Sequence, residues 1–123
     1  MYDDDVNVSV LEGKTLTEVR NLGDELIFVT TDDEEYKMYH MQDCCESVNL
    51  EEVTGDLNDL VGTPILKACE DTNREGPELD MSSYESYTWT FYNFRTIKGS
   101  VTLRWLGSSN GYYSESVDFV RIN

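Results

Sequence analysis

The chain is poor in basic residues, cysteine and long apolar runs, and each shortage argues against a class of protein. Only 9 lysines and arginines stand against 25 aspartates and glutamates, for a net charge of −16. Direct binding to nucleic-acid backbones is therefore disfavoured, because it depends on basic side chains. Three cysteines are too few, and odd in number, for a disulfide scaffold. No stretch approaches the roughly 18 consecutive apolar residues of a membrane span.

What is present suffices for one folded domain. Hydrophobic residues make up 39% of the 123 residues, so we expect residues 1–123 to form a single domain with residues 1–5 frayed. Met1–Asp5 has neither a basic nor an apolar region, so we expect no secretion signal and a cytoplasmic protein. The charge is uneven, since residues 1–85 hold 23 acids and 5 bases whereas residues 86–123 hold 2 acids and 4 bases.

The last third of the chain carries the strongest strand signals. Two glycine-containing turns, Lys98-Gly99 and Asn110-Gly111, separate three runs that favour β structure: Ser86–Ile97, Ser100–Leu106 and Tyr112–Ile122. Glycine at the second turn position permits the positive φ of a tight hairpin. We therefore expect three successive antiparallel strands.

The pairing of the first two runs follows from the turn. A two-residue turn at Lys98-Gly99 places Thr96 opposite Val101. Alternation then puts five apolar side chains on one face and three on the other, so either both faces are covered or a bulge shifts the phase. The first face holds Tyr92, Phe94, Val101, Leu103 and Trp105, and the second holds Trp89, Phe91 and Leu106.

The N-terminal part predicts further strands. Alternating apolar residues favour a first strand over Val6–Leu11. Two hairpins follow, with strands over Leu16–Arg20, Glu25–Thr31 and Tyr36–Met41. Apolar residues on both faces of Glu25–Thr31 indicate a central strand.

The second hairpin has an acidic turn, Asp32–Glu35, which we expect to be a solvated tip. If Thr31 pairs with Tyr36, then Ile27 lies opposite His40.

Residues 47–85 mix strand, helix and loop signals. Ser47–Val53 alternates like a strand, and Asp56 is a suitable N-cap for a short helix over residues 56–61. Pro64–Cys69 favours another strand, and the acidic stretch 71–85 is expected to be a long loop. The chain as a whole is predicted to be mainly β (β-dominated α+β). It would be an antiparallel meander of seven to eight short strands, as a bent sheet, a small barrel or a sandwich.

The chemically most diverse stretch is His40–Glu46. A zinc site is disfavoured there, because adjacent Cys44 and Cys45 point in opposite directions in a strand and no further pair completes a tetrahedron. A catalytic cysteine is disfavoured because a reactive thiolate needs positive rather than acidic surroundings. We expect no metal, no cofactor and no catalytic residue, with Cys44, Cys45 and Cys69 buried in the core. A pocket stays open as an alternative, with the residues His40, Gln42, Asp43, Glu46, Trp89, Tyr112 and Tyr113.

Six segments carry a pattern that is specific to a family: Leu11–Leu16, Met38–Glu46, Gly55–Ile65, Ser86–Trp89, Lys98–Thr102 and Ser109–Glu115. They resemble an uncharacterised family of small bacteriophage and prophage proteins, from about Leu11 to Ile122. The family brings no established activity, so no catalytic residue transfers to this chain. The resemblance implies expression in the cytoplasm of a bacterial host, and a small protein that acts without a partner domain.

Small size, net charge and this resemblance together favour a non-enzymatic inhibitor. We expect it to bind stoichiometrically to a host nucleic-acid-binding or defence protein, whose basic surface accepts carboxylates in place of phosphates. The expected contacts are Asp32, Asp33, Glu34, Glu35, Glu51, Glu52, Asp56, Asp59, Glu70 and Asp71.

Two alternative functions remain. A small-molecule or nucleotide-binding module that sequesters its ligand is disfavoured for phosphorylated ligands by the negative charge, unless Arg95, Arg104 or Arg121 line the site. A small enzyme or a virion component is the second alternative. A homodimer would form through the C-terminal aromatic sheet, where acids are fewest.

Overall fold

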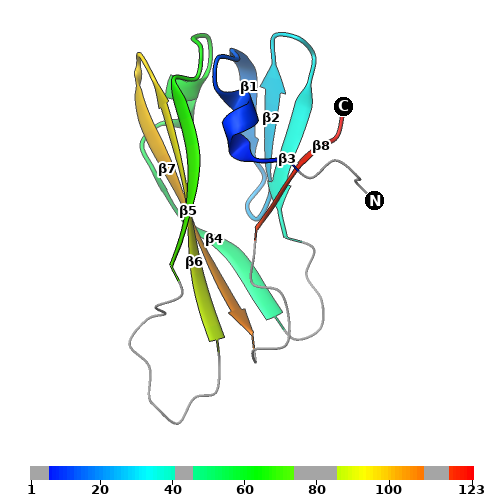
Figure 1. Cartoon of the computed structure of the whole chain (residues 1–123), viewed down its shortest axis with the longest axis vertical. Coiled ribbons are helices and arrows are strands. Elements are labelled where there is room, and N and C mark those ends of the chain that lie inside the picture. Colours follow the sequence, from blue (N-terminus) through cyan, green and yellow to red (C-terminus); the bar gives the residue numbers. More distant parts are fainter. Residues whose placement is uncertain (1–5, 41–45, 74–85, 110–116) are drawn as a thin grey trace.

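Two four-stranded antiparallel sheets face one another in the computed structural model of this chain, which describes residues 6–40, 46–73, 86–109 and 117–123 (Figure 1). The first sheet has the order β1-β2-β3-β8 and the second has the order β4-β7-β6-β5. The first comprises β1 (Leu16–Asn21), β2 (Leu26–Thr30), β3 (Glu35–Tyr39) and β8 (Asp118–Arg121). The second comprises β4 (Glu46–Thr54), β7 (Gly99–Ser109), β6 (Ser86–Thr96) and β5 (Lys67–Asn73). The mainly β prediction is confirmed, and the described strands form a sandwich rather than a closed barrel.

The core lies between the two sheets. Phe28 of the first sheet contacts Phe94 of the second, with ring centroids 5.6 Å apart, and also Phe119 on its own sheet at 5.8 Å. Burial of one such side chain stabilises a fold by about 1.5–3 kcal/mol. The largest fully buried side chains are Trp105, Tyr92, Phe28, Phe94, Leu11, Leu16, Leu26, Met38, Leu60, Ile65, Leu103 and Val8.

The β6–β7 hairpin has the predicted faces but a different turn. Thr96 pairs with Gly99, so the turn residues are Ile97 and Lys98 and the register differs by two residues from the prediction. A shift of two preserves which side chains share a face. The five residues predicted for the inner face are accordingly buried: Tyr92, Phe94, Val101, Leu103 and Trp105.

The third C-terminal strand does not extend this hairpin, so the simple meander is wrong here. β8 pairs with β3 in the first sheet, with Tyr36 opposite Arg121. The stacking of Phe119 on Tyr36, with centroids 5.5 Å apart and planes at 2°, accompanies this choice. The predicted Asn110-Gly111 turn lies outside the described residues.

The first predicted strand, Val6–Leu11, is also wrong. Val8–Leu11 forms a 3-10 helix, η1, in which the Ser9 N–H donates to Asn7 Oδ1 over 2.9 Å. Val8 and Leu11 are both fully buried. Their spacing of three residues suits a helix with three residues per turn, whereas a strand would place them on opposite faces.

The β2–β3 register differs by three residues from the prediction. Phe28, and not Thr31, pairs with Tyr36. The Thr30 hydroxyl accepts hydrogen bonds from the Asp32 and Glu34 N–H groups, both at 3.2 Å, which fixes an earlier turn. An odd shift exchanges the faces, and His40 lies beyond the end of β3 rather than opposite Ile27. β2 is nevertheless a central strand, as predicted.

The middle of the chain is close to expectation. Asp56 caps a 3-10 helix, η2 (Leu57–Leu60), by accepting from the Asn58 N–H over 2.9 Å. The strand expected from Pro64 begins only at Lys67, because Pro64 and Ile65 instead form isolated bridges with Thr15 and Glu12. β5 extends to Asn73, so the predicted loop at 71–85 is wrong for residues 71–73, and residues 74–85 lie outside the described part.

Two glycines with the same backbone conformation offer a test of this packing. Gly55 and Gly23 both have φ of +100°, but a Cβ at Gly55 would collide with the Ser100 carbonyl oxygen, whereas nothing lies within 4 Å at Gly23. Both alanine variants incur the strain of a positive φ, about 1–2 kcal/mol. Gly55→Ala should lose a further 1–3 kcal/mol or so, because the β6–β7 hairpin must move.

Urea unfolding followed by tryptophan fluorescence measures this difference, with Gly23→Ala as the matched control. Equal losses of stability in the two variants would contradict the close approach of Gly55 to β7.

Candidate functional site

The ten predicted partner contacts fall in three places. Asp32–Glu35 occupies the β2–β3 turn and the start of β3, and Glu51 and Glu52 lie near the end of β4. Asp56 and Asp59 follow in η2 and its cap. The β2–β3 turn and η2 lie at the same end, because Leu16 pairs with Thr30 on β2 and also bridges to Val61 just after η2. They therefore lie at one end of the sandwich, the upper end in Figure 1.

The remaining two predicted contacts lie elsewhere. Glu70 and Asp71 are on β5, which is the edge strand opposite to β4 in the second sheet. The structure therefore does not bring all ten carboxylates onto one face. It gathers eight of them around the end formed by the β2–β3 turn, the last residues of β4 and η2, which we call the acidic end.

Most bases of the chain are already occupied by carboxylates. Among the residues that the structure describes, five of eight lysines and arginines make ion pairs: Lys14 and Arg121 with Glu34, Arg20 with Glu18, Lys37 with Glu25, and Arg104 with Glu52. Glu34 and Glu52 are thereby compensated. Within the described part, Asp32, Asp33, Glu51 and Asp56 are exposed and make no ion pair, so their charge is available to a partner.

The Lys14–Glu34 pair is the shortest of these contacts. The Lys14 ammonium donates to Glu34 Oε1 over 2.6 Å, and Arg121 approaches the other oxygen at 3.4 Å. This hydrogen bond, helped by the charges of Lys14 and Arg121, lowers the pKa of Glu34 below its usual value, and it raises the pKa of Lys14. The pair ties the start of β1 to the β2–β3 turn.

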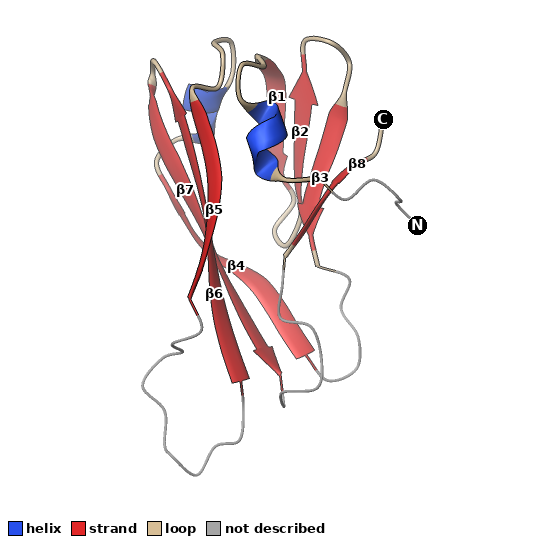
Figure 2. Ribbon diagram, in the orientation of Figure 1, coloured by secondary structure: helices blue, strands red, loops and turns tan. Residues whose placement is uncertain are grey.

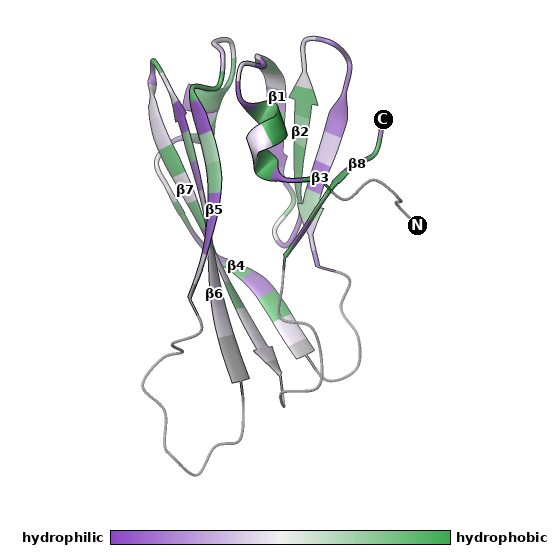
Figure 3. Ribbon diagram, viewed as in Figure 1, coloured by the Kyte–Doolittle hydropathy of each residue, from purple (hydrophilic) through white to green (hydrophobic). Residues whose placement is uncertain are grey.

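Apolar side chains are exposed at the same end. Ile97 in the β6–β7 turn is 76% exposed and Leu66 is 56% exposed. The turn is tied to η2, since the Thr96 hydroxyl donates to the Asp59 carbonyl over 2.5 Å and the Lys98 ammonium to the Val61 carbonyl over 2.6 Å. Figures 2 and 3 show this arrangement, with η2 behind the strands and the hydrophobic tip of the turn above it. An exposed isoleucine thus lies at the same end of the sandwich as the exposed carboxylates, in the second sheet, whereas Asp32 and Asp33 are in the turn of the first (Figure 1).

A second surface is the outer face of the second sheet. Trp89 and Phe91 stack there with centroids 6.5 Å apart, and the Arg104 guanidinium lies 5.1 Å from the Trp89 ring centre. These side chains are half-buried, as the prediction of a second apolar face in β6 and β7 requires. The homodimer that we expect through this sheet stays a prediction.

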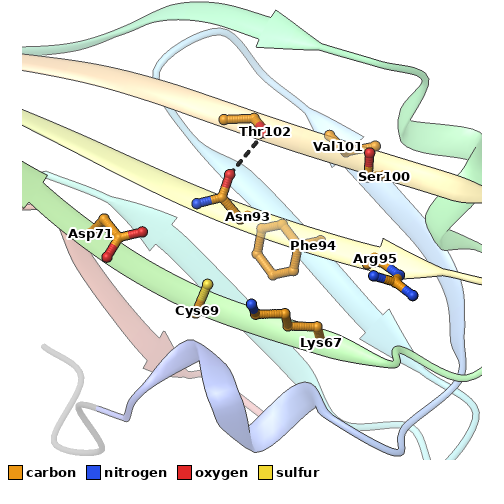
Figure 4. A pocket seen from close by; sticks show the side chains of 9 residues that line it. All are labelled: Lys67, Cys69, Asp71, Asn93, Phe94, Arg95, Ser100, Val101 and Thr102. Atoms are coloured by element: carbon orange, nitrogen blue, oxygen red, sulfur yellow. Dashed lines mark hydrogen bonds between the residues drawn. The ribbon is translucent and has the colours of Figure 1, made fainter.

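The same outer face holds a shallow pocket of about 280 Å³ (Figure 4). Side chains of β5, β6 and β7 line it, and pairing places Lys67 opposite Arg95 and Cys69 opposite Asn93. The full lining is Lys67, Cys69, Asp71, Asn93, Phe94, Arg95, Ser100, Val101 and Thr102. Sequence reasoning missed this pocket, although the alternation of polar residues at 93, 95, 100 and 102 against the apolar inner face was the available signal.

Only some residues of the pocket that the sequence predicted lie in the described part of the chain, so the pocket stays a prediction. His40 follows β3 in the first sheet, whereas Trp89 is on the outer face of the second sheet and points away from it. Glu46 begins β4. Gln42, Asp43, Tyr112 and Tyr113 lie outside the described residues.

One of the three cysteines lies in the described part of the chain. Cys69 is free and half-buried on the outer face, so its predicted place in the core is wrong, while Cys44 and Cys45 lie outside the described residues. Side chains alternate between the two faces of a strand, and Ala68 points into the core. The next residue, Cys69, therefore points outward. The described residues contain no group of three histidine, cysteine or acidic side chains that could hold a metal ion.

A family model described as Domain of unknown function (DUF7448) matches residues 9–119 of the chain. No curated protein and no solved structure matches it. Among the described residues, no helix is long and apolar enough to cross a membrane.

The Lys14–Glu34 pair leads to a pH-dependent stability. Because the pKa of Glu34 is lower in the folded than in the unfolded chain, its contribution is complete above the ordinary value of 4.5 and is lost as the pH falls through the lower folded value. Glu34→Gln should therefore be less stable than wild type at pH 7, and this difference should shrink below pH 4.5.

Thermal unfolding at a series of pH values measures the difference, with Asp24→Asn as control because Asp24 is exposed and makes no ion pair with described residues. A loss for Glu34→Gln that is as large at pH 3 as at pH 7 would show that the ion pair is not its cause.

Proposed function

The chain belongs to the DUF7448 family, whose function is unknown, and we propose that it is a non-catalytic protein that binds a basic partner protein through its acidic end. The contact surface would combine the uncompensated carboxylates Asp32, Asp33, Glu51 and Asp56 with the exposed Ile97. The observation that carries the proposal is this combination of free negative charge and exposed apolar surface at one end of the sandwich.

The charge supports a basic partner. A net charge of −16 generates a long-range field that accelerates association with a positive surface and weakens as salt is added. Lys14, Arg121 and Arg104 compensate only Glu34 and Glu52 there, so Asp32, Asp33, Glu51 and Asp56 keep their negative charge at the acidic end.

The exposed apolar side chain supports a specific interface rather than loose attraction. Protein interfaces join an apolar centre, which supplies most of the binding energy, to a polar rim that sets orientation and rate. Ile97 would serve as the centre and the carboxylates as the rim. Its turn is anchored to η2 by two hydrogen bonds, so little conformational entropy would be lost on binding.

We further propose that the partner is a host nucleic-acid-binding or defence protein in a bacterial cytoplasm. The support for this class is the resemblance of the sequence to small phage and prophage proteins, together with the chemistry of the surface. A groove that has evolved to hold phosphates offers lysines and arginines at a spacing that carboxylates can also meet. The protein would then act as a stoichiometric inhibitor.

An enzymatic role has less support. Among the described residues, His40 follows β3 of the first sheet, whereas Cys69 is on β5 of the second sheet and faces outward. A thiol activated by an imidazole base needs the two within hydrogen-bond reach. A virion component stays the remaining alternative, and a small ligand is taken up below.

Matched variants test the contribution of charge. Asp32→Asn/Asp33→Asn removes two charges at the acidic end, and asparagine tolerates the positive φ of 63° at Asp33. Asp24→Asn/Glu25→Gln removes the same formal charge from the β1–β2 turn, which lies at the other end of the first sheet. With a partner purified from bacterial lysate, association at low salt should slow about tenfold for the first variant and far less for the second.

A second matched pair tests the apolar centre. Ile97→Ser should speed dissociation about tenfold or more, whereas Leu22→Ser should leave it unchanged, although Leu22 is also exposed, at 61%, in the β1–β2 turn. Surface plasmon resonance measures both rates. Equal effects of the two members of either pair would show that the acidic end is not the interface.

A further inference from the structure

We propose that the pocket on the outer face of β5, β6 and β7 binds the oxyanion group of a small ligand between Lys67 and Arg95. This site goes beyond the proposed function, because it lies on a different surface and would take a small molecule rather than a protein. Figure 4 shows its side chains, with Arg95 toward one end of the pocket, Asp71 toward the other, and the Lys67 ammonium extending between them toward Cys69.

The two cations of the pocket lie on neighbouring strands. Lys67 and Arg95 are directly opposite one another in the β5–β6 ladder. Like charges at this position repel, and side chains so placed lower the stability of a sheet. In the described part of the chain, neither side chain has a carboxylate within 4 Å, although five other bases there are paired. A bound anion would remove the repulsion and provide the missing counter-charge.

Neutral hydrogen-bond donors also line the pocket. The Thr102 hydroxyl donates to Asn93 Oδ1 over 2.9 Å, which orients the amide and leaves its NH₂ group as a donor (Figure 4). Ser100 pairs with Arg95 across β6 and β7 and adds a hydroxyl to the lining of the pocket. Ammonium, guanidinium, amide and hydroxyl donors together suit the oxygens of a phosphate or carboxylate group.

The pocket carries a negative charge as well as its two positive charges, which limits the chemical groups that the rest of the ligand can have. Asp71 lies four residues from Lys67 on the same strand face, about 13 Å along the backbone. Its carboxylate repels a second anionic group but accepts hydrogen bonds from a hydroxyl or ammonium group. A volume of about 280 Å³ lies just below the roughly 300–1,000 Å³ of sites for drug-sized ligands. The structure thus favours a small organic anion that carries a donor at its other end.

The Arg95 guanidinium is the group that distinguishes this site from other parts of the surface. Arg104 is occupied by Glu52 at 3.1 Å and Arg121 by Glu34 at 3.4 Å, so neither is free to hold a ligand anion. Arg95 is exposed, and its planar guanidinium can bind two oxygens of one oxyanion at once. We therefore expect the loss of Arg95 to weaken binding more than the loss of Lys67.

Nuclear magnetic resonance titrations of the ¹⁵N-labelled full chain test the site. The probes are inorganic phosphate, glycerol phosphate and acetate, added at constant ionic strength with chloride as the replaced ion. Saturable shifts confined to the amides of β5, of residues 93–95 and of residues 100–102 are expected. Tighter binding of phosphate than of acetate identifies a phosphoryl group, and the reverse order identifies a carboxylate.

The variants separate the site from a general effect of charge. Arg95→Gln should weaken binding of the tighter anion at least tenfold, whereas Arg20→Gln, which changes the net charge equally on the other sheet, should leave it within twofold. Asp71→Asn should strengthen binding of inorganic phosphate about two- to fourfold, because a like charge is removed. It should strengthen binding of glycerol phosphate less, because the neutral amide oxygen of asparagine accepts more weakly from the hydroxyl groups than the carboxylate does.

Three results would overturn the proposal: shifts that do not saturate, shifts scattered over both sheets, or equal losses of affinity in Arg95→Gln and Arg20→Gln. The substituted side chains are exposed, so the variants should fold, and the unchanged spectrum of the first sheet verifies this. A negative result at the pocket would not bear on the proposed function. The variants that test that function, Ile97→Ser and Asp32→Asn/Asp33→Asn, change no residue of the pocket.

Discussion

The contact of Phe28 with Phe94 and Phe119 holds the two sheets together, and the remaining structure depends on it. Phe94 brings the β6–β7 hairpin against the first sheet. Phe119 brings the end of the chain into that same sheet, where Tyr36 stacks on it. Because β8 is placed by this aromatic group, the order of strands in space differs from their order in the sequence. Both candidate surfaces follow, since one is the end of the sandwich and the other is the outer face that the core leaves uncovered.

A shortage of bases explains how the surface is divided. With 25 acids and 9 bases, every ion pair that the fold uses removes a base from the surface and leaves uncompensated acids elsewhere. Lys14 and Arg121 both form ion pairs with Glu34, and these pairs connect the start of β1, the β2–β3 turn and the end of β8. Among the described residues, four exposed acids without an ion pair lie at the acidic end, and the bases without one are Lys67 and Arg95 in the pocket of the second sheet and Lys98 in the β6–β7 turn. The protein thus presents surfaces of opposite local character despite its large negative charge.

The free edge of the second sheet shows that carboxylates also have structural roles. The Ala68 N–H points away from β6 and donates to Glu12 Oε2 over 3.1 Å, so a side chain satisfies the start of the edge strand. An unpaired strand edge can recruit another chain, and acidic side chains in and beside it oppose this. Glu70 and Asp71, which the sequence suggested as partner contacts, are on this same edge strand. The presence of acidic residues in the sequence is therefore a weaker guide to the partner surface than whether those residues are exposed and free of ion pairs in the structure.

The sequence by itself determined the β class, the two hairpins, the capping role of Asp56 and the inner face of β6 and β7. These depend on local alternation and on turn and cap residues, which neighbours along the chain decide. Only the tertiary structure decided the β2–β3 register, the helical form of Val8–Leu11, the sheet that β8 joins and the pairing of Lys67 with Arg95. Register depends on which turn hydrogen bonds form around Thr30, and strand partners depend on contacts between residues far apart. The acidic residues could be found from composition, but which of them stay free follows from ion pairs that only the folded chain makes.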